Sequence, residues 1–168
     1  MKTLLLMRHG KSDWGADFDS DHERPLNERG VRSARVMGRL LTSLGLAPEC
    51  VITSTAVRAR TTAELAAAAG GWECEMVLEP GFYGADPDDV LLFASSAPPV
   101  DRLMLIGHEP TWSAVIRRLT GAWVQVKTAT VAVIEVDAGD WSGLASTPAT
   151  MAALHHPRRY FGSKYDQP

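Results

Sequence analysis

Residues 3–10 read TLLLMRHG, an apolar run that ends in an arginine, a histidine and a glycine. The apolar part has the length and composition of a short buried strand. A second apolar run, Leu103–Ile106, ends in a similar way, with GHEP at residues 107–110. His9 and His108 therefore each follow an apolar strand. Two histidines placed alike at strand ends predict one shared site.

Strand-like and helix-like segments alternate along the rest of the chain. We expect strands at residues 3–8, 50–54, 74–78, 102–106, 128–136 and 143–154, and helices at about 28–44, 56–69, 86–92 and 110–119. Pro148 lies inside the last predicted strand and favours an edge position for it. The alternation predicts a three-layer α/β/α sandwich with a largely parallel central sheet, formed by a single domain over residues 1–168.

The composition argues against several classes of partner. The formal net charge is −3 and no basic run exceeds two residues, so we expect no nucleic acid and no membrane partner. Cys50 and Cys74 lack metal or redox spacing, which predicts reduced core thiols of a cytoplasmic protein. The cluster His155–His156 and Arg158–Arg159 has no partner ligands in metal-binding spacing, so we predict that it lies on the surface. The sequence indicates no oligomeric state.

The carboxyl ends of parallel strands meet at one edge of a sheet, where ligands bind. Arg8 and His9 follow the first predicted strand, Arg58 comes just after the second, and His108 follows the fourth. Arginine is always protonated and repels cations, so this set predicts neither a metal site nor any other cofactor. Guanidinium groups match phosphate oxygens, and Thr55 precedes a helix whose N-terminus also favours anions. The sequence therefore predicts a phosphate site.

A histidine beside arginines loses basicity, because neighbouring positive charge disfavours its protonated form. A neutral imidazole is able to attack phosphorus and to carry the phosphoryl group, which divides one displacement into two easier ones. The arginines and the second histidine would then stabilise the charge on the equatorial oxygens.

These motifs resemble those of the histidine phosphatase superfamily, whose fold is phosphoglycerate-mutase-like. The matching segments are Arg8-His9-Gly10, RPLNERG at residues 24–30, RARTTA at residues 58–63 and Gly107-His108-Glu109-Pro110. Within the superfamily the chain is most similar to SixA-type phosphohistidine phosphatases. The resemblance implies that His9 is the nucleophile, that Arg8 and Arg58 form a phosphate clamp, and that His108 binds the transferred phosphoryl group.

Many members of this superfamily place a glutamate general acid between the second arginine and the second histidine. Glu79 lies in that interval but is out of step with the expected position. A sugar alkoxide needs a proton donor in order to leave, whereas the imidazole of a phosphohistidine leaves readily. This favours a protein phosphohistidine as the substrate. Two alternatives stay open: a phosphomonoesterase of small phosphorylated molecules that uses Glu79 as its acid, and a non-catalytic module that binds phosphate or phosphoproteins.

An acidic loop follows the first motif and contains Asp17, Asp19 and Asp21. The spacing imitates a calcium loop, but His22 stands where such a loop needs glycine, so we do not predict calcium. We expect a solvated loop near the mouth of the pocket, with a solvated His22 and with Trp14 close enough to line the pocket.

Overall fold

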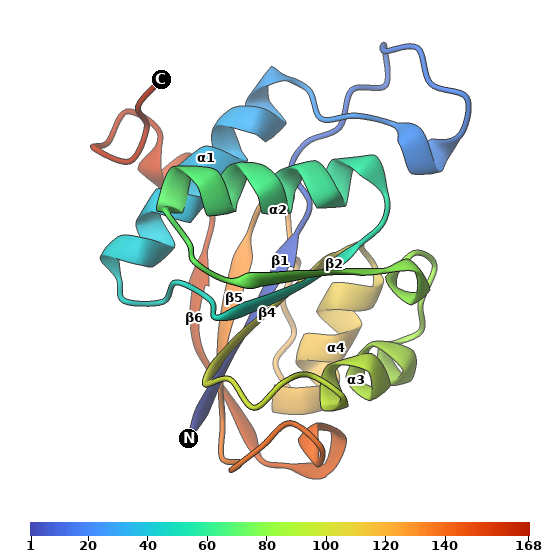
Figure 1. Ribbon diagram of the computed structural model, residues 1–168, viewed down its shortest axis with the longest axis vertical. Coiled ribbons are helices and arrows are strands. Elements are labelled where there is room, and N and C mark those ends of the chain that lie inside the picture. The colour runs from blue at the N-terminus through green and yellow to red at the C-terminus, as the bar shows by residue number, and fades with distance from the viewer.

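The structure is a computed structural model that describes residues 1–168. One six-stranded sheet forms its centre, and helices cover both faces (Figure 1). The strands are β1 (Lys2–Arg8), β2 (Cys50–Ser54), β3 (Glu75–Glu79), β4 (Arg102–Gly107), β5 (Val131–Val136) and β6 (Ala149–His155); the helices are α1 (Glu28–Ser43), α2 (Val57–Gly70), α3 (Pro87–Ser95) and α4 (Thr111–Thr120). The predicted α/β/α sandwich is confirmed. No helix is both long and apolar enough to span a membrane.

The strand order in the sheet is β3-β2-β4-β1-β5-β6. The first four strands of the chain pair in parallel, and β5 runs antiparallel to both of its neighbours, β1 and β6. Since only β5 is reversed, the sheet is largely parallel, as predicted. The carboxyl ends of β1, β2, β3 and β4 therefore lie at the same edge.

The last two strands are shorter than their sequence patterns suggest. The predicted strand 128–136 begins only at β5, because the N–H of Thr130 donates to the carbonyl of Lys127 at 3.0 Å and closes a turn. The predicted strand 143–154 begins with a short 3-10 helix, and β6 starts directly after Pro148. β6 lies at the edge of the sheet, as this proline indicated.

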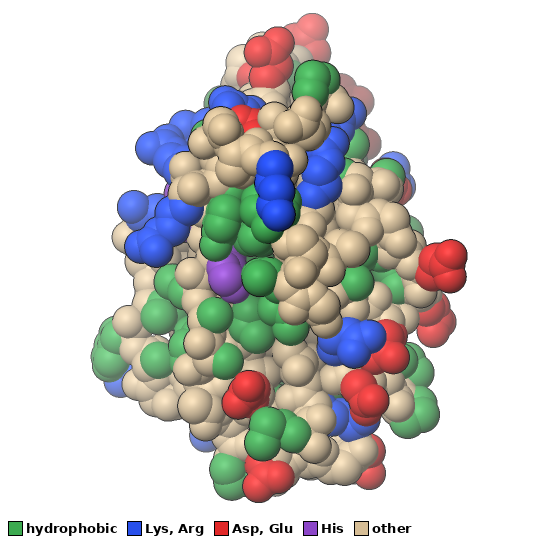
Figure 2. All heavy atoms as spheres, turned by 90° about the vertical axis from the view of Figure 1, so that its left-hand side faces the viewer, with side chains coloured by type: hydrophobic (Ala, Val, Ile, Leu, Met, Phe, Trp, Pro, Cys, Tyr) green, Lys and Arg blue, Asp and Glu red, His purple; other side chains and the backbone are tan.

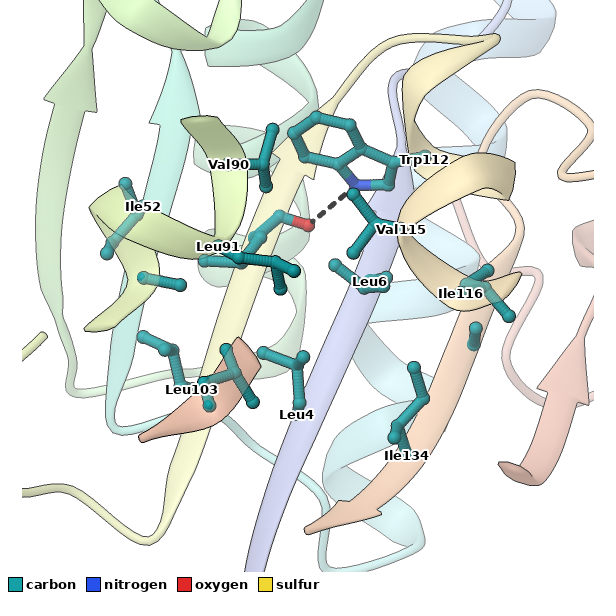
Figure 3. Packing of buried hydrophobic residues seen from close by; sticks show 14 of the residues in the cluster. Leu4, Leu6, Ile52, Val90, Leu91, Leu103, Trp112, Val115, Ile116 and Ile134 are labelled. Atoms are coloured by element: carbon teal, nitrogen blue, oxygen red, sulfur yellow. Dashed lines mark hydrogen bonds between the residues drawn. The ribbon is translucent and has the colours of Figure 1, made fainter. Parts of the chain in front are cut away.

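The stretch that opens the chain is buried on both faces of the sheet. Leu4 and Leu6 belong to the core on the α3 and α4 side, where Figure 3 shows them near residues of both helices. Leu5 and Met7 belong to the core on the α1 and α2 side. All four are 0% exposed, and burial of each side chain contributes about 1.5–3 kcal/mol. A strand buried on both faces reads as an unbroken apolar run.

Candidate active site

The register between β1 and β4 places the two motif histidines together. Arg8 is the partner of Gly107 in this parallel pair, and the N–H of His9 donates to the Gly107 carbonyl at 3.1 Å. His9 and His108 thus leave adjacent strands at the same level. The centroids of their rings lie 5.3 Å apart.

A cavity of about 650 Å³ opens at this edge of the sheet. The four predicted site residues, Arg8, His9, Arg58 and His108, all line it, and so does Trp14, as expected for a pocket-lining tryptophan. Its wall also includes Lys11, Ser12, Arg24, Tyr83, Glu109 and Thr128. Arginine and lysine outnumber the single carboxylate in the wall, and this excess of positive charge suits an anionic ligand.

The His9 ring is fixed in one tautomer. Its Nδ1 lies 2.6 Å from the carbonyl oxygen of Gly10, and a carbonyl only accepts, so Nδ1 carries the proton. Nε2 keeps its lone pair and receives the Nε–H of Arg58 at 3.4 Å. Burial lowers the pKa of His9 to about 3, and the nearby His108, Arg58 and Arg8 add to this effect. The imidazole is therefore neutral at neutral pH, with its free nitrogen beside the arginine.

Arg58 is buried at the start of α2, where it is 5% exposed. Its Nη1 donates to the backbone carbonyl of Asp21 at 2.7 Å, and its Nη2 donates to the Asp21 carboxylate at 3.0 Å. The pKa of Asp21 is lowered to about 2, chiefly by its hydrogen bond with Arg24. The guanidinium of Arg58, which is predicted to clamp phosphate, is thus hydrogen-bonded to the ionised carboxylate of Asp21. The sequence had placed Asp21 only in a solvated loop.

Arg8 and His108 form hydrogen bonds with residues that lie outside the sequence motifs quoted above. Arg8 donates from Nη1 to the carbonyl of Val126 at 3.1 Å, while its buried Nε has no partner. The Nε2 of His108 lies 2.8 Å from the hydroxyl of the buried Ser54. Burial, followed by the charge of Arg58, lowers the pKa of His108 to about 4. His108 is therefore a second neutral imidazole in the cavity.

Arg24 joins the site from the loop that follows β1. It is 6% exposed, donates to the Asp21 carboxylate at 2.8 Å and to the hydroxyl of Ser12, and lies over the Trp14 ring at 3.7 Å. Sequence reasoning assigned this arginine no role in the site. The signal that marks it is its place in the Arg-Pro-Leu segment shared with the superfamily.

Tyr83 is a second wall residue that the sequence reasoning missed. Its hydroxyl donates to the Asp21 carboxylate at 2.9 Å, and its ring lies edge-on to the rings of His22 and His108. The expectation of a solvated His22 was wrong, because this ring is half-buried and its Nε2 lies 2.9 Å from the Thr55 hydroxyl. The acidic loop therefore contacts the site at its end, through Asp21 and His22, whereas Asp17 and Asp19 are exposed.

Glu79 does not line the cavity. Its carboxylate accepts the N–H of Gly81 at 2.8 Å and caps the short 3-10 helix after β3. The carboxylate in the wall, Glu109, accepts both the N–H and the hydroxyl of Ser113, at 2.8 and 2.5 Å. No group of three or more His, Cys, Asp or Glu side chains is placed to hold a metal ion.

Comparison with known proteins agrees with this geometry. Residues 4–86 match the model of the histidine phosphatase superfamily (branch 1). An uncharacterized protein of Mycobacterium leprae is 36% identical over 166 residues, which cover 90% of this chain and 100% of that protein. The proposed phosphohistidine phosphatase SixA of Nakamurella multipartitia is similar in structure, with a TM-score of 0.82, 29% identity and coverage of 93% and 96% of the two chains.

A further solved structure, the protein histidine phosphatase SixA in complex with tungstate, has a TM-score of 0.81 at 22% identity, with coverage of 94% of this chain and 98% of that one. At that identity the likeness concerns the fold. Fold and site together define an enzyme that removes phosphate. The chain belongs to the histidine phosphatase superfamily and is SixA-like. The sequence analysis left a non-catalytic binding module open as an alternative, and the assignment as a phosphatase excludes it.

Proposed function

We propose that this phosphatase hydrolyses phosphohistidine in a protein substrate, that it forms a phosphohistidine intermediate on His9, and that it needs no metal ion. The observation that carries the choice of substrate is the lack of a free carboxyl acid on the cavity wall. Glu79 caps Gly81, Glu109 is bonded twice to Ser113, and Asp21 is ionised. This supports a substrate whose leaving group departs without a strong proton donor.

In the first step, the Nε2 lone pair of His9 attacks phosphorus and a new N–P bond forms. The N–P bond of the substrate breaks, its electrons return to the leaving imidazole nitrogen, and that nitrogen takes a proton from solvent. The hydrogen bond from Nδ1 to the Gly10 carbonyl supports this role, because it keeps Nε2 unprotonated and directs it into the cavity.

In the second step, water attacks the phosphorus on His9. The N–P electrons return to Nε2, and the protons of the water leave with the phosphate and with solvent. Arg8 and Arg58 stabilise the charge on the transferring oxygens, and His108, at the end of the adjacent strand β4, binds the same group. The positive wall accounts for phosphate binding without a cation, since a metal ion would be repelled by the same arginines.

A substrate panel tests the proposal. A phosphohistidine peptide and an aryl phosphate are compared with chelator present, for the wild type and for His9→Ala. We expect turnover of the phosphohistidine peptide that persists with chelator and disappears in His9→Ala. Turnover that vanishes with chelator would contradict metal independence. Faster turnover of the aryl ester that depends on Glu79 would instead identify a small-molecule phosphomonoesterase.

A further inference from the structure

A second cavity, of about 200 Å³, lies next to the active site. Its wall is formed by Arg29 and Ser33 of α1, by Lys127 and Thr128 of the turn before β5, and by the segment that follows β6, which contributes His156 and Arg158. Thr128 also lines the active-site cavity, so the two cavities share a wall. Pro157 is the one apolar residue in its wall.

The cationic side chains of this cavity have no partners in the chain. Arg29, Lys127 and Arg158 take part in none of the ion pairs of the molecule. The charged side chains that help to lower the pKa of His156 are also all cations, and Arg159 is one of them. Figure 2 shows Lys and Arg side chains gathered over the upper part of the face that carries α1, β6 and the C-terminal segment. Convergent, uncompensated positive charge favours a bound anion.

Ser33 adds a polar group to the wall of this cavity. It is 5% exposed, lines the cavity and forms no hydrogen bond through its hydroxyl within the chain. The buried polar side-chain atoms without a partner are Arg8 Nε and Thr130 Oγ1, so the Ser33 hydroxyl is accessible from the cavity and is free to bond a ligand atom there. The exposed cations at the rim and the hydroxyl of Ser33 at the wall surround one small space.

We propose that this second cavity is an anion site that takes a phosphate group. Three full positive charges match a dianion better than the single charge of a carboxylate, and the fork of a guanidinium matches phosphate oxygens in particular. The small volume and the mostly polar lining leave no place for an aromatic ring. The group is either free phosphate or a second phosphate of the molecule whose first phosphate reacts at His9, since Thr128 joins the two cavities.

Calorimetric titration with inorganic phosphate tests the site, and it needs no turnover. We expect two binding events per chain in the wild type and loss of one of them, by about tenfold in affinity or more, in Lys127→Gln and in Arg158→Gln. Arg159→Gln is the matched control, because it removes the same charge from the adjacent exposed residue, which does not line the cavity. A single binding event in the wild type, or equal losses in Arg158→Gln and Arg159→Gln, would overturn the proposal.

Linear diol bisphosphates of graded length distinguish the two sources of the group. They are titrated into the His9→Ala chain, in which the proposed nucleophile is absent. If one length binds about tenfold tighter than its monophosphate, and Arg158→Gln removes this gain, the site takes a second phosphate of the same ligand. If no length gains affinity while the second event with inorganic phosphate persists, the site takes free phosphate. Both results require the site to exist.

Discussion

The Asp21 carboxylate lies 3.0 Å from Nη2 of Arg58, and the backbone carbonyl of the same residue accepts Nη1 at 2.7 Å. In the proposed mechanism the same guanidinium clamps the transferring phosphate. An incoming phosphate therefore meets an arginine whose donors already face a carboxylate. Asp21 comes from the loop after β1, so this loop and the substrate compete for one side chain.

Asp21→Asn should strengthen substrate binding. The amide keeps the backbone contact with Arg58 but removes the negative charge beside the phosphate site. Because the pair is partly exposed, we expect a modest effect, a KM lowered by about two- to fivefold. Steady-state kinetics on a phosphohistidine peptide measures it, with Asp19→Asn as the control for loss of one charge in the same loop. A KM that stays the same or rises would show that Asp21 does not compete with substrate.

The stability of the fold should fall in mild acid. Burial lowers the pKa of His9 to about 3 and that of His108 to about 4, whereas an unfolded chain protonates histidine near 6.5. Between these values the unfolded state binds more protons, so the free energy of unfolding decreases as pH drops below about 6.5. We expect a loss of about 1–2 kcal/mol per histidine between pH 7 and pH 5, measured by urea unfolding.

His108→Asn provides the comparison for this prediction. The variant keeps His9 but lacks the second histidine with a lowered pKa, so its free energy of unfolding should depend less steeply on pH over the same window. A pH dependence as steep as that of the wild type would mean that His108 is not responsible.

Ser54 should position His108 through the contact of 2.8 Å between its hydroxyl and Nε2. Ser54→Ala removes this contact, and we expect kcat to fall about tenfold with little change in KM. Thr53→Ala, on the same buried strand, is the control for lost packing and should keep its kcat. If both variants lose kcat equally, the effect belongs to the strand and not to the histidine.

Glu79→Gln should leave the turnover of phosphohistidine within about twofold of the wild type. The carboxylate caps Gly81 outside the cavity, and glutamine keeps an oxygen that is able to accept the same N–H. Steady-state rates on the peptide and on an aryl phosphate measure the effect. A large loss on the peptide would mean that Glu79 acts as a proton donor after all.

The sequence predicted the parts of the site that follow strands. Arg8, His9 and His108 could be placed because buried parallel strands read as apolar runs and their carboxyl ends share one edge. Asp21 and Tyr83 could not, because they lie in a short 3-10 helix and in a turn, whose positions depend on tertiary contacts.

Dependence on tertiary contacts also explains why the ends of two strands and the burial of His22 were predicted wrongly. Turn hydrogen bonds such as that from Thr130 to Lys127 shorten a strand without changing its β-branched composition. A histidine in an acidic loop reads as solvated unless its contact with Thr55 is known.

The role of His9 as the phosphoryl carrier is the central claim, and trapping the intermediate tests it most directly. The enzyme is mixed with labelled phosphohistidine peptide, quenched in alkali within the first turnover and digested for mass spectrometry. We predict a phosphoryl group on the peptide that contains His9, stable in alkali and lost in acid, and absent from His9→Ala. Full turnover by His9→Ala, or a phosphoryl group found on His108 instead, would contradict the account.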